Sequence, residues 1–99
     1  MNSLNHIIEQ DQTVLVDFYA SWCGPCKMMP PILKHVKDSL GDAIRILKVD
    51  VDKNPKVAQQ YQVRGVPTLI LFKSGNVLWR QSGVVDAPTL LQILKGKID

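Results

Sequence analysis

Both cysteines of the chain fall in one short segment, Trp22-Cys23-Gly24-Pro25-Cys26, and this segment constrains the fold more than any other. It follows an apolar run over residues 14–19 and precedes a stretch of helical character over residues 27–37. A strand that ends in a turn and opens a helix places Cys23 at the helix N-terminus, where unpaired backbone N–H groups and the helix dipole favour an anion. We therefore expect an exposed Cys23 thiol that ionises readily, with Cys26 shielded about one turn away. Such a pair suits thiol–disulfide exchange.

Two other uses of a cysteine pair fit the sequence less well. A zinc site needs about four ligands, usually in two pairs, whereas this chain has one cysteine pair, and His6 and His35 match no ligand spacing. A purely structural disulfide that closes so small a loop would restrict the unfolded chain little. Redox chemistry is therefore favoured, and no metal is expected.

The composition indicates one domain over residues 1–99, because 45% hydrophobic residues suffice for one modest core. The net charge is +3 and the twelve Lys and Arg are scattered, so we expect no nucleic-acid partner. Glu9 and Asp11 interrupt the N-terminal stretch, and no run approaches the roughly 18 apolar residues of a membrane span, so neither a signal peptide nor a membrane is expected. The expected location is the reducing cytoplasm, where a close cysteine pair is more often catalytic than structural.

Hydrophobic periodicity and turn residues predict helices and strands in the order αβαβαββα. The predicted helices run from Ser3, as a cap, to Asp11-Gln12; over 23–40, kinked at Pro30 and Pro31 and ended by Gly41; from Asn54, as a cap, to Tyr61; and over 87–95. The predicted strands cover 13–19, 43–51, 68–72 and 77–82, the last two joined by a hairpin turn at 74–76. Early alternation and a late hairpin imply an α/β fold with a mixed central sheet and helices on both faces.

The motif Trp22-Cys23-Gly24-Pro25-Cys26-Lys27 resembles the active site of the thioredoxin family. The resemblance extends over residues 13–95 in the family's order and close to its spacings. The further matching segments are Val16-Asp17-Phe18, Pro31, Lys48-Val49-Asp50, Val63-Arg64-Gly65-Val66-Pro67-Thr68, Phe72-Lys73-Ser74-Gly75 and Gly83. A lone Cys-x-x-Cys is a moderate signal, whereas its combination with Val66-Pro67-Thr68 some forty residues later is a strong one.

The chain departs from the family pattern in three places. Thioredoxins have a further strand before the first helix, which pairs with the counterpart of residues 43–51, and this chain starts too late to supply it. We therefore expect about four strands with 43–51 as an open edge; charges there favour a monomer, and edge-to-edge dimerisation is the alternative. Tyr19 stands where many members have tryptophan, and Pro30 is additional to the family's Pro31.

The resemblance implies a role for each reacting residue. Cys23 is the nucleophile that forms a mixed disulfide with the substrate, and Cys26 resolves it. Asp17, between apolar neighbours in its strand, is implied to be a buried carboxyl that takes the proton from Cys26, with Lys48 as its companion. An acid at the strand end that points to solvent, and a solvated Lys48, are the alternative interpretations.

The resemblance also implies a substrate-binding surface around Cys23. Pro67 matches the family's cis-proline, which would leave the backbone of Val66 free to hydrogen-bond an extended substrate segment. The expected rim comprises Trp22, Gly24, Pro25, Gly65, Val66, Pro67, Gly83 and Val84. Trp22 could instead serve only in packing, which is also the default role for Trp79.

These implications define the expected function, a protein-disulfide reductase. Gly24 and Pro25 carry no charge to hold a thiolate, which favours a reductant over an oxidant. The resemblance implies no bound cofactor: the Cys23–Cys26 pair is the redox centre, and a thioredoxin reductase that uses flavin and NADPH would regenerate it. Its partners would be that reductase and disulfide-containing proteins. The alternatives are a dedicated reductant of one client such as a peroxidase, a non-catalytic binding module, and an oxidase or isomerase.

Overall fold

The computed structural model describes residues 3–10 and 12–98, and its elements follow the predicted order αβαβαββα with two 3-10 turns added. The helices are α1 (Ser3–Glu9), α2 (Met29–Leu40), α3 (Pro55–Gln60) and α4 (Ala87–Ile98), and the 3-10 turns are η1 (Pro25–Met28) and η2 (Gly41–Ala43). The strands are β1 (Thr13–Tyr19), β2 (Arg45–Asp50), β3 (Thr68–Lys73) and β4 (Asn76–Ser82).

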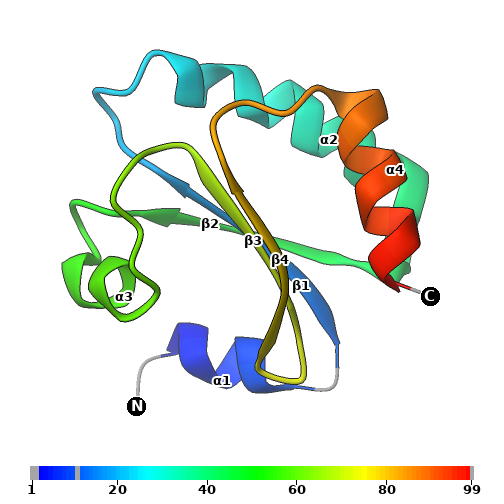
Figure 1. Cartoon of the computed structure of the whole chain (residues 1–99), viewed down its shortest axis with the longest axis horizontal. Coiled ribbons are helices and arrows are strands. Elements are labelled where there is room, and N and C mark those ends of the chain that lie inside the picture. Colours follow the sequence, from blue (N-terminus) through cyan, green and yellow to red (C-terminus); the bar gives the residue numbers. More distant parts are fainter. Residues whose placement is uncertain (1–2, 11, 99) are drawn as a thin grey trace.

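The four strands form one mixed sheet in the order β2-β1-β3-β4. β1 pairs with β2 in parallel and with β3 antiparallel, and β4 returns antiparallel to β3. Helices α2 and α4 cover one face of this sheet and α1 and α3 the other (Figure 1). The predicted α/β fold with a four-stranded mixed sheet is therefore confirmed.

Alternation along β1 divides the core into two clusters and places the one acid of this strand. Leu15 packs with residues of α2 and α4, whereas Val14, Val16 and Phe18 pack with residues of α1 and α3. Because successive side chains of a strand point to opposite faces, Asp17 shares the face of Leu15. The acid therefore lies on the α2 side of the sheet, where the second cysteine is found.

The second helix begins differently from the prediction. Residues 25–28 form a 3-10 turn and the α-helix starts only at Met29, so Cys23 precedes the helix rather than opening it. Pro30 and Pro31 then fall in the first turn of α2, where the missing N–H groups cost no intrahelical hydrogen bond. The interruption expected at the prolines therefore takes the form of a change from 3-10 to α geometry.

Several other boundaries shift by a few residues. Residues 41–43 form η2, so β2 begins at Arg45 rather than residue 43, while α4 extends to Ile98. Asn54 precedes α3 but makes no capping bond, because its side-chain amide donates to the carbonyl of Asp50 at 3.0 Å. Asp11 and the side chain of Ser3 lie outside the described residues.

The hairpin turn is shorter than predicted. Ser74 and Gly75 form it alone, with φ of 51° and 83°, and Asn76 already belongs to β4. Two consecutive residues with positive φ are typical of the two-residue turn whose twist matches that of the flanking strands.

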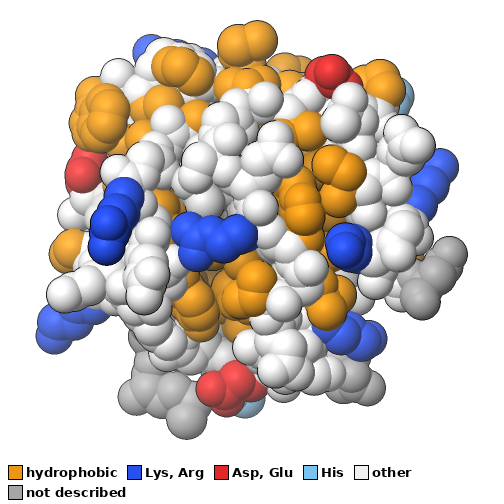
Figure 2. Space-filling model, viewed as in Figure 1, with side chains coloured by type: hydrophobic (Ala, Val, Ile, Leu, Met, Phe, Trp, Pro, Cys, Tyr) orange, Lys and Arg blue, Asp and Glu red, His pale blue; other side chains and the backbone are white. Residues whose placement is uncertain are grey.

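The surface seen in Figure 2 carries its Lys and Arg side chains singly, separated by polar and apolar groups. Strand β2 forms one edge of the sheet, as expected, and presents Arg45 and Lys48 there. Within the ranges 3–10 and 12–98, no helix has the length and apolar character that crossing a membrane requires.

Candidate active site

The two cysteines are joined by a disulfide at the end of the sheet where β1 finishes. Their Cα atoms are 5.3 Å apart, and the pair packs against Ala20 with Tyr19 and Val66 alongside. Cys23 is only 3% exposed and Cys26 6%. The expectation of an exposed Cys23 is therefore wrong for the disulfide form, because the neighbouring loops cover Cys23 as much as the first helical turn covers Cys26.

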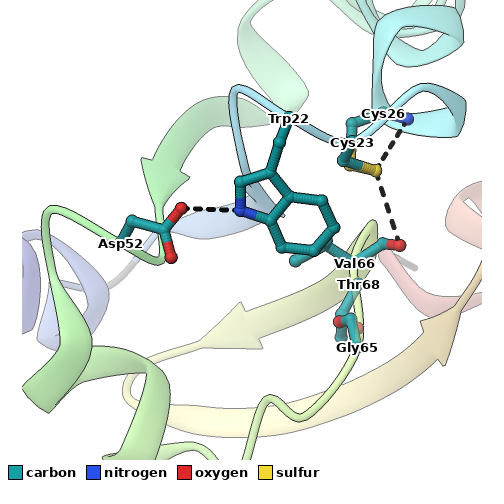
Figure 3. Close-up of a disulfide and its surroundings, with 7 residues drawn as sticks. All are labelled: Trp22, Cys23, Cys26, Asp52, Gly65, Val66 and Thr68. Atoms are coloured by element: carbon teal, nitrogen blue, oxygen red, sulfur yellow. Dashed lines mark hydrogen bonds between the residues drawn. A yellow bond between two sulfur atoms is a disulfide. The ribbon is translucent and has the colours of Figure 1, made fainter.

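One backbone N–H at the start of η1 points at the sulfur of Cys23. The N–H of Cys26 donates to Cys23 Sγ at 3.2 Å (Figure 3). The N–H of Cys23 itself donates to the carbonyl of Ala20 at 3.1 Å. Although the turn is 3-10 rather than α, its first N–H groups still lack intrahelical partners. When the disulfide is open, this N–H points at the Cys23 thiolate and stabilises its negative charge.

Asp17 is buried, with 2% of its surface exposed, and its Oδ1 has no hydrogen-bond partner among the described residues. Burial raises the pKa of this carboxyl from 3.8 to about 6, against the opposing effect of the Lys48 charge. The interpretation of Asp17 as a solvent-facing acid is therefore wrong. Unpaired and buried, this carboxyl is poised to exchange a proton near neutral pH.

A cavity of about 250 Å³ joins this carboxyl to the redox pair. Its lining includes Asp17, Cys26 and Lys48, with Tyr19 and Pro30 among the other residues. Lys48 lies opposite Asp17 in the β1–β2 register and its side chain is exposed. The structure thus brings together three of the four predicted reacting residues around one space, with Cys23 bonded to Cys26 at its end.

Trp22 stands out of the surface beside the disulfide, 71% exposed. Its indole Nε1–H donates to Asp52 Oδ2 at 2.8 Å, which fixes the ring on the side of Cys23 facing the end of β2 (Figure 3). An indole combines a large apolar surface with a polar N–H, which is why tryptophan is enriched at interfaces. The alternative of a purely packing role for Trp22 is not supported by this exposure.

The loop before β3 forms the other side of the site. The carbonyl oxygen of Val66 lies 3.6 Å from Cys23 Sγ, and the Val66–Pro67 peptide bond is cis, as the resemblance implied. The N–H of Val66 donates to no other described residue. The N–H of Gly83 donates to the carbonyl of Pro67 at 2.8 Å, which brings the end of β4 to the same place.

The remaining rim residues are mostly placed as expected. Gly24, Pro25 and Gly65 are exposed around the cysteines. Val84 differs, since it packs against the cluster under α2 and α4, where Trp79 also packs.

Asp52 is a site residue that the sequence analysis did not single out for function. One signal was available: the carboxyl ends of parallel strands meet at the same edge of a sheet, so an acid just after β2 falls near the motif that follows β1. On this argument the sequence could have predicted the hydrogen bond from the Trp22 indole N–H to Asp52.

Comparison with known proteins agrees with this geometry. The thioredoxin family model matches residues 2–96 of the chain. The chain belongs to the thioredoxin family. Thioredoxin-family chains with a bonded Cys-x-x-Cys pair are thiol–disulfide oxidoreductases, and this chain is one of them.

Several thioredoxins resemble the chain over most of its length. A thioredoxin-like protein of Synechocystis sp. is 52% identical over 82 residues, which cover 83% of this chain and 78% of that protein. A thioredoxin of Rickettsia typhi is 40% identical, over 95% of this chain and 90% of that one. The chloroplastic thioredoxin Y of Oryza sativa is 40% identical over 99% of this chain, which spans 59% of the rice protein.

Among solved structures, one described as that of a malarial protein superposes with a TM-score of 0.82 at 31% identity, over 89% of this chain and 99% of that chain. Within the described part of this thioredoxin-family chain, no three His, Cys, Asp or Glu side chains are grouped so that they could hold a metal ion. The redox centre of the described structure is the sulfur pair itself.

Proposed function

We propose that this chain reduces disulfide bonds in client proteins, as a protein-disulfide reductase. The observation that carries the proposal is the contact of the Cys26 N–H with the Cys23 sulfur at 3.2 Å, in a pair that is already joined as a disulfide. This contact makes Cys23 the better thiolate and leaves Cys26 as the second thiol. The order of the two attacks follows from it.

In the first step the Cys23 thiolate attacks one sulfur of the client disulfide. A Cys23–client disulfide forms, the client's own S–S bond breaks, and its second sulfur leaves as a thiolate that takes a proton from water. In the second step Cys26 gives its proton to a base and attacks Cys23 Sγ; the Cys23–Cys26 disulfide forms, the Cys23–client bond breaks, and the first client sulfur leaves as a thiolate that takes a proton from water. The client gains two electrons and two protons, and the dithiol becomes the disulfide.

Asp17 is the base that we assign to the second step. Its carboxyl and Cys26 line the same cavity, and its pKa of about 6 leaves it mostly ionised at pH 7 yet able to hold a proton. Lys48, across the register from Asp17, favours the ionised carboxylate. Lys48 thereby keeps the base available at neutral pH.

The client is held beside Cys23 by backbone and apolar contacts. The unpaired N–H and the carbonyl of Val66 offer hydrogen bonds to an extended segment, and the exposed indole of Trp22 offers apolar surface. Gly24, Pro25, Gly65 and Gly83 add little bulk around this contact, so the site accepts varied side chains. These features support a reductant of several clients over one dedicated to a single protein.

The oxidised pair has to be regenerated by an external dithiol donor. We propose an NADPH-dependent flavoprotein, a thioredoxin reductase, as that donor, with no cofactor bound by this chain. The proposed setting is a reducing compartment, the cytoplasm in the first place. The chloroplast in the name of the rice relative describes that protein alone, so we do not propose a plastid setting for this chain.

The test is reduction of insulin disulfides with dithiothreitol as electron donor. We expect the wild-type chain to accelerate the reaction and the Cys23→Ser, Cys26→Ser double variant to leave the uncatalysed rate. Reduction of a small disulfide such as bis(2-hydroxyethyl) disulfide is measured in parallel. A wild-type chain that is inactive on both substrates, with a Cys23–Cys26 pair that still opens with dithiothreitol, would overturn the proposal.

A further inference from the structure

The segment that carries Val66 runs over residues 61–67 between α3 and β3, and residues in β4 and directly after it bond to its two ends. We call it the 61–67 loop. Its first two residues are bonded by the side chain of Arg80, and its last residue is bonded by Gly83. The conformation of the loop beside Cys23 therefore depends on the strand behind it.

At its start, the loop ends α3 in a tight backbone turn. The N–H of Val63 donates to the carbonyl of Ala58 at 2.8 Å and that of Gln62 to Gln59 at 3.0 Å, the bond pair of a Schellman C-terminus. Gln62 takes the left-handed position that glycine usually fills, with φ of 55°. This conformation costs a non-glycine residue about 1–2 kcal/mol, so it persists only where other bonds hold it.

Arg80 supplies such bonds. Its Nη1 donates to the carbonyl of Tyr61 at 2.7 Å and its Nη2 to the carbonyl of Gln62 at 3.3 Å. These carbonyls follow the last turn of α3, where a positive charge is favoured by the helix dipole. The guanidinium thus bonds to the carbonyls directly before and after the Cα of the strained Gln62.

At its other end the loop is joined to the next residues of the same strand. Thr68 Oγ1 donates to the carbonyl of Gly65 at 2.7 Å and lies 3.0 Å from Ser82 Oγ, and Gly83 N–H bonds to Pro67 (Figure 3 shows Gly65 and Thr68 below Val66). Arg80 and Ser82 are two residues apart in β4, opposite Ile70 and Thr68, so they project to the same face. The loop is therefore bonded at its start by Arg80 of β4 and at its end by Gly83, the residue after β4, with Val66 between these two points.

We propose that Arg80 is a positioning residue for client binding: it holds the 61–67 loop so that the backbone of Val66 is ready to receive an extended client segment. The inference rests on the proposed function, since it assigns the loop to client contact. Arg80 touches neither sulfur, and its own side chain is exposed, so it contributes to the geometry of the loop rather than to the dithiol chemistry.

The consequence is a difference between two kinds of substrate. A protein client makes main-chain bonds to Val66, and a loose loop must first be ordered, which lowers client affinity. A small disulfide needs only the Cys23 sulfur. Loss of Arg80 is therefore expected to raise KM for insulin about three- to tenfold, while kcat, KM for the small disulfide and the Cys23–Cys26 reduction potential stay unchanged.

The experiment compares Arg80→Met with Arg80→Lys and with Gln81→Met, a neighbour on the opposite face of β4. Lysine keeps the positive charge but lacks the two parallel N–H donors of arginine, so the KM of Arg80→Lys for insulin should lie between those of wild type and Arg80→Met. Gln81→Met should behave as wild type. Amide exchange at Gln62 and Val63, whose N–H groups are bonded in the turn, should become faster in Arg80→Met.

Each result separates this inference from the function itself. A wild-type chain without reductase activity overturns the proposed function. A wild-type chain that is active, with Arg80→Met unchanged in its insulin KM, overturns only the role of Arg80. If Arg80→Met changes kcat, the small-disulfide KM or the reduction potential as much as the insulin KM, then Arg80 acts on the whole site or on folding, and positioning is again refuted.

Discussion

Replacing Asp17 by Asn tests the buried carboxyl through the stability of the oxidised chain. The folded-state pKa of about 6 lies above the ordinary 3.8, so between pH 4 and 6 the folded chain binds a proton that the unfolded chain has lost. The free energy of unfolding therefore falls as pH rises through this window. Each tenfold difference in proton affinity is worth about 1.4 kcal/mol, and at pH 4 the unfolded carboxyl is already partly ionised, so the ionised carboxylate costs about 2 kcal/mol at pH 7 relative to pH 4.

Asparagine is close in shape and cannot ionise. The free energy of unfolding of the variant should therefore gain about 2 kcal/mol over wild type between pH 4 and pH 7, whatever its constant offset at pH 4. Urea unfolding of both oxidised proteins at half-unit pH steps measures this difference curve. The exposed Asp42→Asn variant, at the far end of the sheet, controls for the loss of one negative charge.

A difference curve that stays flat from pH 4 to pH 7 would refute the reasoning, because the carboxyl would then not be desolvated.

The same variant also tests the proposed base. Its first attack on a client should keep the wild-type rate, while release of the client from the mixed disulfide should slow about a hundredfold at pH 7. An unchanged release rate in single-turnover experiments would remove Asp17 from the mechanism and leave the stability argument intact.

Three further predictions follow from particular residues. Cys26→Ser should accumulate a covalent client adduct on Cys23, detected by intact-mass spectrometry, and an adduct found elsewhere would reverse the assigned order of attack. Gln62→Gly should raise the free energy of unfolding, measured by urea titration, by about 0.5–1 kcal/mol, because glycine adopts a positive φ without strain. A lower free energy of unfolding would show that Gln62 is not strained in this turn. The β2 edge, with Arg45 and Lys48, should leave the chain monomeric by light scattering at two concentrations tenfold apart, and a mass that doubles with concentration would show edge pairing.

The fold was predictable because its signals are local. The apolar runs of the strands, the Cys23–Cys26 spacing and the turn near Gly75 each depend on residues close together in the chain. The burial of Asp17 could also be predicted from its apolar neighbours in β1, because a strand that is apolar on both alternations is covered on both faces. The alternation of side chains along β1 could not predict the cavity beside Asp17, because residues from β1, β2 and the start of α2 form it together.

The parts that escaped prediction depend on contacts between distant segments. Asp52 meets Trp22 across 30 positions of sequence, and Arg80 reaches Tyr61 across 19. The cover over Cys23 likewise comes from the 61–67 loop. The start of α2 was missed for another reason. Residues 25–28 form a 3-10 turn before the α-helix begins at Met29, and the sequence pattern around Gly24 and the prolines fits both geometries.

The strand directions put all of the chemistry at one end of the sheet. β1 and β2 finish there, β3 starts there and β4 returns there, so η2 and the Ser74–Gly75 turn lie at the opposite end. That opposite end is therefore a site for covalent attachment. A surface or dye coupled at residue 42, in the exposed η2 turn, would leave the end of the sheet that carries the sulfur pair facing solution, so that the molecule serves as an immobilised thiol–disulfide oxidoreductase.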